Sequence, residues 1–143
     1  MTRYSVVCVR MGSVAAIAAA AALPLLPAAA HAQARWKAIG KTASGNSVFV
    51  DTRSVKRANG IVTAIVRVRF TQPVQSPSGA ITSSRTLAMF DCARQTIAAK
   101  ENTYFIDERA HRIADHTVNK QPGFGPALKG TLGDVALTYF CHG

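Results

Sequence analysis

The chain has 143 residues, of which 48% are hydrophobic, and its formal net charge at pH 7 is +10. This length suits one domain and leaves little room for a second. The excess of positive charge favours anionic partners such as membrane surfaces, polyanionic glycans or nucleic acid, and it also keeps a small protein soluble.

The segment 1–32 has the pattern of a cleaved secretory signal peptide. Arg3 and Arg10 form a positive start without any acidic residue, and an Ala-rich apolar run follows. The run ends in a small-x-small pattern, the motif that signal peptidase requires. We therefore expect cleavage between Ala32 and Gln33.

A retained membrane anchor is the alternative for this segment, because the apolar run is about long enough to span a bilayer. Alanine contributes little apolar transfer energy, however, and Pro24 and Pro27 interrupt the run near its end, which favours cleavage. Cys8 precedes the apolar run, whereas a lipoprotein carries its cysteine directly after it. Since there is also no twin-arginine pair, we expect Sec export to the periplasm or the medium, with no lipid anchor and no transmembrane segment after cleavage.

The expected mature domain, residues 33–143, has 111 residues, a formal net charge of +8 and two cysteines, Cys92 and Cys141. An exported chain reaches an oxidising compartment, so we expect these cysteines to form a disulfide. Closing a loop of about 50 residues stabilises a fold by roughly 4 kcal/mol in the chain-entropy model. Neither cysteine has a CxxC partner, which argues against a metal site or a catalytic thiol. Export also argues against nucleic acid as a partner.

The first half of this domain has the residue patterns of β-strands. Short strands are expected at Arg35–Gly40 and Ser47–Asp51, and Asn59-Gly60 is a typical hairpin turn. The strongest strand signal is 61–70, where alternate residues share an apolar face: Val62, Ala64, Val66, Val68 and Phe70. The other face carries arginines, which is typical of an antiparallel sheet with one solvated face.

The second half continues with strands and ends in a helix. Residues 72–79 contain two prolines, two serines and a glycine, and they predict a loop with a mobile tip. Further strands are expected at Ser83–Cys92, Gln95–Ile106 and Arg112–Val118, with a polar turn at Asp107–His111 and an irregular stretch at Gln121–Pro126.

Thr131 is a candidate N-cap for a C-terminal helix, because apolar residues recur at helical spacing after it: Leu132, Val135, Ala136, Tyr139 and Phe140. The β-branched and aromatic content of this segment leaves a final strand as the alternative. The predicted fold is α+β, an antiparallel meandering sheet with a C-terminal helix packed on it and one disulfide.

Several short motifs occur in a familiar order: Trp36–Gly40, Val48–Asp51 with the Ser54-Val55 turn, a long strand ending near Phe70, Phe90–Arg94 around the first cysteine, and a final segment ending in Cys141. From Trp36 to His142 this order resembles the surface-adhesin E family of bacterial exported proteins. The resemblance implies a sheet backed by a C-terminal helix, a disulfide, and adhesion to host extracellular-matrix or plasma proteins. The adhesive member is a lipoprotein, whereas this chain has no cysteine at its expected cleavage site.

His111, Asp115 and His116 are the one candidate metal set, because two histidines and a carboxylate suit a divalent ion. On a strand, however, His116 points away from the other two, so we favour solvated histidines and predict no metal site. His142 could join this set from the C-terminus. No nucleophile-elbow or phosphate-binding glycine motif occurs. We therefore predict no enzymatic activity and no cofactor.

The remaining candidate ligand-binding residues are five arginines: Arg67, Arg69, Arg85, Arg53 and Arg57. Guanidinium groups bind carboxylates, sulfates and phosphates in bidentate geometry. A solvated charged face is the simpler interpretation. The leading hypothesis is a non-enzymatic module that binds a host matrix or plasma protein, or another anionic ligand, through this basic face and the 72–79 loop. The alternative is a periplasmic structural protein that contacts cell-envelope components.

Overall fold

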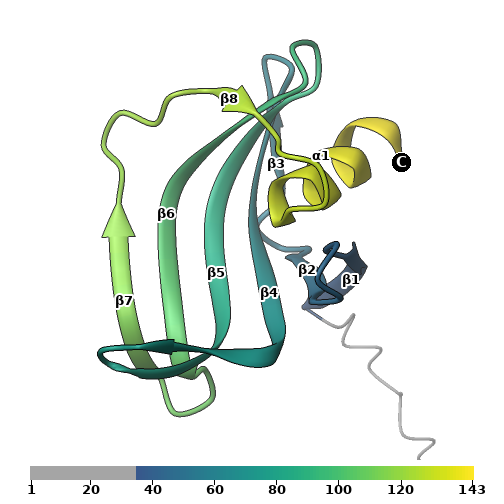
Figure 1. Cartoon of the computed structure of the whole chain (residues 1–143). Helices are drawn as coiled ribbons and strands as arrows, with labels where there is room; N and C mark the ends of the chain where they lie inside the picture. The colour runs from purple at the N-terminus through teal and green to yellow at the C-terminus, as the bar shows by residue number, and fades with distance from the viewer. Residues whose placement is uncertain (1–34) are drawn as a thin grey trace, which may run out of the picture. The chain divides into compact units, whose positions relative to one another are not determined.

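The computed structural model describes residues 35–143, so the expected signal peptide and its cleavage site lie outside the described residues. The described part is an antiparallel sheet with one C-terminal helix (Figure 1). Its elements are β1 (Trp36–Lys41), β2 (Ser47–Asp51), β3 (Lys56–Ala58), β4 (Ile61–Ser76), β5 (Gly79–Asp91), β6 (Thr96–Asp107), β7 (Arg112–Val118), β8 (Gly125–Pro126) and α1 (Leu132–His142). The predicted α+β class is confirmed.

The strands follow one another across the sheet in the order β1-β2-β4-β5-β6-β7, and every neighbouring pair is antiparallel. The short strand β3 pairs with the start of β4, across the predicted two-residue turn at Asn59-Gly60. Strand β8 pairs with β6 at Ile97. The meander predicted from the hairpin turns is therefore present, with β3 and β8 as short additions.

The sheet has an inner face, which packs against α1, and an outer face on the opposite side. The apolar positions of β4 alternate as predicted, and those on the inner face are buried. Together with α1 they form the core, whose buried members are Val50, Val62, Ala64, Val66, Ala88, Phe90, Ala136, Leu137 and Phe140. The ring centres of Phe90 and Phe140 lie 5.0 Å apart, which joins β5 to the helix.

Helix α1 begins with a reciprocal cap. The Thr131 side chain accepts a hydrogen bond from the Asp134 amide, and the Asp134 carboxylate accepts one from the Gly130 amide at 2.8 Å. The first bond satisfies one of the backbone donors that a helix start leaves unpaired, and the second fixes the residue before the cap. The predicted helix is thus confirmed and the alternative of a final strand is excluded. The predicted disulfide is also present, with the sulfurs of Cys92 and Cys141 2.04 Å apart.

The loop predicted at residues 72–79 is wrong, because the two strands continue through it. Strand β4 extends to Ser76 and β5 starts at Gly79, so Pro77 and Ser78 alone form the turn. Strand β2 pairs with β4 up to Arg69 and no further, so the rest of β4 is a free edge. Proline is tolerated on such an edge because no neighbour requires its missing N–H group.

Candidate functional site

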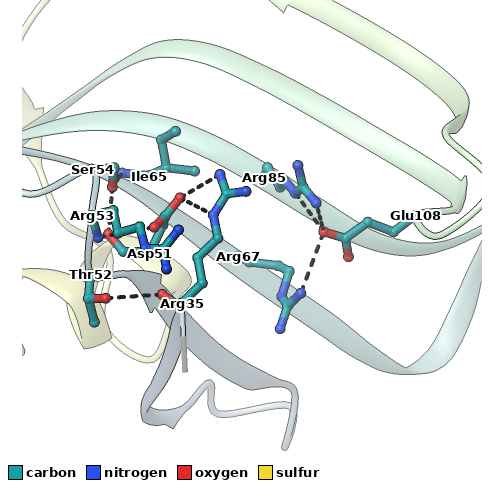
Figure 2. Close-up of polar contacts among 9 residues, drawn as sticks. All are labelled: Arg35, Asp51, Thr52, Arg53, Ser54, Ile65, Arg67, Arg85 and Glu108. Atoms are coloured by element: carbon teal, nitrogen blue, oxygen red, sulfur yellow. Dashed lines mark hydrogen bonds and ion pairs between the residues drawn. The ribbon is translucent and has the colours of Figure 1, made fainter. Parts of the chain in front are cut away.

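Two arginines lie directly opposite each other on the outer face, since Arg67 of β4 pairs with Arg85 of β5. Like charges in this arrangement repel. Glu108, from the turn between β6 and β7, offsets the repulsion: its Oε1 accepts a hydrogen bond from Arg85 Nε and lies 3.6 Å from Arg67 Nη1 (Figure 2). Its second oxygen accepts a hydrogen bond from the Ser83 hydroxyl at 3.0 Å. One carboxylate therefore holds both arginines.

Three aromatic rings pack against the same two arginines. The guanidinium of Arg67 lies 4.2 Å from the ring centre of Trp36 and 4.8 Å from that of Phe49. The guanidinium of Arg85 lies 5.3 Å from Trp36 and 5.2 Å from Phe105. These distances fall within the range of cation–π attraction. The rings come from β1, β2 and β6, so the cluster spans almost the whole sheet.

Arg67 is the more buried of the pair, with 15% of its side chain exposed against 30% for Arg85. Burial lowers the pKa of Arg67, and the nearby Glu108 carboxylate opposes this lowering. Its Nε is buried and makes no hydrogen bond to any of the described residues. The structure thus keeps a charged group in a place where its charged form is disfavoured.

A hollow of about 660 Å³, which we call the basic hollow, opens beside this cluster. Its lining includes four arginines: Arg67, Arg69, Arg85 and Arg109. Two carboxylates share it, but Glu108 is bound to the arginines, and Asp107 Oδ1 accepts two backbone N–H bonds of its own turn. Arg69 and Arg109 are exposed, so their guanidinium groups can reach a ligand.

The other two candidate arginines lie elsewhere. Arg53 lines a separate hollow of the outer face, and its amide donates to the Asp51 carboxylate at 3.1 Å. Arg57 pairs with Val62 and therefore belongs to the inner face, where it shares a hollow with Tyr139. The sequence held a signal for this separation, because a two-residue turn at Asn59-Gly60 places Arg57 opposite a core position.

A second ion pair joins the start of the described chain to the end of β2. Both Arg35 Nε and Arg35 Nη2 lie 2.8 Å from Asp51 Oδ2 (Figure 2), and this bond raises the pKa of Arg35. Asp51 is 2% exposed. In the turn that follows β2, the Asp51 carboxylate accepts a hydrogen bond from the Arg53 amide, and the Asp51 carbonyl oxygen accepts one from the Ser54 hydroxyl at 2.7 Å. The pair fixes β1 beside β2 and so positions Trp36.

The candidate metal residues point to different places. His111 lines the basic hollow, whereas His116 lies 2.9 Å from the Thr103 hydroxyl and 3.9 Å from the Glu101 carboxylate. Asp115 accepts a hydrogen bond from Thr117. Within residues 35–143 no three His, Cys, Asp or Glu side chains are grouped to hold a metal ion. In the same part of the chain no helix is long and apolar enough to cross a membrane.

Comparison with known proteins places this chain in a family. The sequence profile of surface-adhesin protein E matches residues 36–142. The chain belongs to the surface-adhesin protein E family. This confirms the resemblance predicted from the sequence, and it supports an adhesin-like surface or exported protein. Membership suggests a binding protein rather than an enzyme.

Solved structures of Haemophilus influenzae protein E are similar to this member of the family. Crystal form II of that protein is 13% identical, with 77% of this chain and 89% of that chain covered and a TM-score of 0.53. Another of its structures is 14% identical, with 77% and 86% covered and a TM-score of 0.51. At this identity the likeness shows a shared fold alone. A search of curated proteins found no match.

Proposed function

We propose that the mature domain is an exported, non-enzymatic binding module that holds acidic segments of host matrix or plasma proteins in the basic hollow. One observation carries the proposal: four arginines converge there, while both carboxylates of the hollow are already engaged by neighbouring groups. An incoming carboxylate therefore meets an excess of positive charge. Family membership adds support, because the family is named for a surface adhesin.

The exposed and the more buried arginines have different roles in the proposed site. Arg69 and Arg109 stand at the surface and provide direct contacts to the ligand. Arg67 and Arg85 are held by Glu108 and the aromatic rings, so they act as a fixed positive floor rather than as flexible arms. A fixed floor loses little side-chain entropy when a ligand binds, which favours affinity.

The hairpin of β4 and β5 forms one wall of the proposed site. The hollow is lined by Phe70 and Thr82, which lie where the hairpin leaves the main sheet. Beyond them the hairpin is largely exposed, and Val74 is 49% exposed. Residues 72–79 therefore offer a ligand an exposed pair of strand ends joined by a tight turn, in place of the loop predicted from their composition.

Charge reversal distinguishes binding in the basic hollow from binding that depends on net charge alone. The double variant Arg69→Glu/Arg109→Glu changes the two exposed arginines of the hollow. The matched control, Arg53→Glu/Arg57→Glu, makes the same change of charge outside it. Binding to a short polyglutamate peptide and to a panel of matrix and plasma proteins is measured by surface plasmon resonance. We expect the first variant to weaken binding by about tenfold or more, about 1.4 kcal/mol, and the control to weaken it much less.

Equal losses in the two variants would mean that binding follows net charge rather than this site. No loss in either would overturn the proposal. Recovery of the native protein from the periplasm, with no surface exposure on intact cells, would favour the cell-envelope alternative.

Export is part of the same proposal and has its own measurement. We expect the intact mass of the native protein to correspond to a chain that starts near Gln33, without lipid and with its cysteines oxidised. A heavier species in the outer membrane would contradict the proposed cleavage without lipidation.

A further inference from the structure

The inner face holds a second hollow, which differs in character from the basic one. It has a volume of about 350 Å³ and lies between the sheet and the start of α1. Figure 1 shows α1 next to β4 at one side of the sheet, with β6 and β7 on the other side. The apolar part of the lining comes from both layers: Val66, Val68, Phe70, Phe90, Ile97 and Leu132. We call it the apolar hollow.

Two small residues leave this space open. Ala88 of β5 pairs directly with Ala99 of β6, and both line the hollow. A methyl group at each position cannot fill the gap that larger aliphatic side chains would occupy in a packed core. Ala88 is 5% exposed, whereas Ala99 is exposed to solvent. The hollow therefore reaches from the buried core at Ala88 to the surface at Ala99.

A row of polar groups borders the apolar walls. Cross-strand pairing puts Ser84 beside Tyr104 and Thr86 beside Asn102 on this face. The Thr86 hydroxyl donates to Asn102 Oδ1 at 2.7 Å, which orients the amide. Asn102 Nδ2, the Tyr104 hydroxyl and the Ser84 hydroxyl make no hydrogen bond to the described residues, although Ser84 is 6% exposed. These groups are available to a bound molecule.

Among the described residues, none that lines the apolar hollow has a charged side chain. A ligand with a carboxylate or an ammonium group would lose its hydration there without gaining a counter-charge, which is unfavourable. A neutral hydroxyl or amide, in contrast, would find both a donor and acceptors in the polar row. The volume is within the range of about 300–1,000 Å³ that is usual for small-molecule sites.

We propose that the apolar hollow binds an uncharged small amphiphile, in which an aliphatic chain or ring carries a hydroxyl or amide group. The apolar part lies over Ala88 and Ala99 against Leu132, and the polar end bonds Asn102 Nδ2 and the Tyr104 hydroxyl. This site is on the opposite face from the basic hollow, and Phe70 is the one described residue that lines both.

Displacement of a fluorescent probe tests the ligand class. N-phenyl-1-naphthylamine is uncharged and becomes fluorescent in apolar surroundings, so it is titrated into the exported protein. We expect saturable binding at one site, displacement by 1-octanol, and displacement by octanoate that is weaker by about tenfold or more at pH 7. The alcohol and the carboxylate have the same chain length, so the comparison isolates the charge. No saturable binding, or equal displacement by the two compounds, would overturn the proposal.

A variant that fills the apolar hollow tests whether the probe binds there. Ala99→Leu places a larger side chain in the open end of the hollow at an exposed position, so the core is not disturbed. We expect about tenfold weaker probe binding with an unchanged thermal midpoint. The control, Ala58→Leu, makes the same change on the exposed strand β3, and the Arg69→Glu variant alters the opposite face. Both should bind the probe as the parent does. Full binding by Ala99→Leu would contradict the site, since the variant remains folded.

Discussion

The guanidinium of Arg67 lies 4.2 Å from the ring centre of Trp36, although their strands, β4 and β1, do not pair with each other. Strand β2 lies between them, and its Phe49 contacts the same guanidinium at 4.8 Å. The floor of the basic hollow is thus supported from the edge of the sheet. Trp36 is the single tryptophan of the chain, so its fluorescence reports on that floor.

Replacing this ring should weaken the fold. We expect Trp36→Leu to lower the free energy of unfolding by about 2 kcal/mol, because contacts to Arg35, Arg67 and Arg85 and part of an aromatic surface are lost. Urea unfolding followed by circular dichroism measures the change. Phe124→Leu is the control, since Phe124 is an aromatic residue that is 42% exposed. If the two variants lose the same stability, Trp36 does not support the cluster.

Removing the charge of Glu108 should lower the free energy of unfolding by more than the exposure of this side chain suggests. In Glu108→Gln the opposed Arg67 and Arg85 no longer share a carboxylate, and we expect a loss of about 1–3 kcal/mol. Glu101→Gln is the control, because Glu101 is half-exposed and lies 3.9 Å from His116. It should change stability by no more than about 0.5 kcal/mol. A loss in Glu108→Gln as small as that of the control would show that the arginines do not need the carboxylate.

Arg67 itself should be dispensable for stability. Its pKa is lowered in the folded state, so folding disfavours the charged form at every pH below that pKa, which includes the physiological range. Arg67→Met removes this cost and keeps a side chain that packs on Trp36. We expect a free energy of unfolding equal to the parent's or higher by up to about 1 kcal/mol, by denaturant titration. A loss of more than about 1 kcal/mol would mean that the cation–π contacts outweigh burial.

The disulfide should supply much of the stability of so small a domain. Its cysteines are 49 residues apart, for which the chain-entropy model gives about 4 kcal/mol. We expect Cys92→Ser/Cys141→Ser to lose about that amount in urea unfolding, and reduction of the parent protein to have the same effect. A loss below about 1 kcal/mol would show that the reduced, unfolded chain is already compact.

Gly40 permits the close approach of the helix to β1. Its φ is +153°, and a Cβ placed there would lie 2.9 Å from Val135 Cγ1. We expect Gly40→Ala to lower the free energy of unfolding by about 1–3 kcal/mol, because both the backbone and α1 must shift. Gly123→Ala, which meets nothing within 4 Å, is the control and should be near neutral when both are compared by thermal unfolding. Equal midpoints would mean that α1 adjusts freely.

Local patterns predicted most of the fold. The limits of β2 and β7 agree with the predicted strands, because alternation and turn residues act over a few positions. The helix start was equally local, since the cap at Thr131 involves residues three apart. The prediction of a loop at 72–79 was wrong because a strand tolerates proline only where no neighbouring strand pairs with it. Where the neighbouring strand ends is set by long-range pairing.

The candidate site was predictable in part for the same reason. Period-two alternation correctly put Arg67 and Arg69 on one face, and antiparallel pairing brought Arg85 beside them. Glu108 and Trp36 were missed, because their places depend on register across several strands and on the conformation of a turn. No pattern within a short window contains that information.

Along β4 and β5, residues next to each other in sequence serve different hollows: Val66 and Val68 line the apolar one, and Arg67 lines the basic one. Inserting or deleting one residue within these strands would exchange the two sets of side chains, so both hollows would be lost together. Both hollows therefore constrain the number of residues in this part of the chain. Over evolutionary time substitutions can change the lining of one hollow without the other, except at Phe70, which lines both, whereas an insertion or deletion here would change both at once.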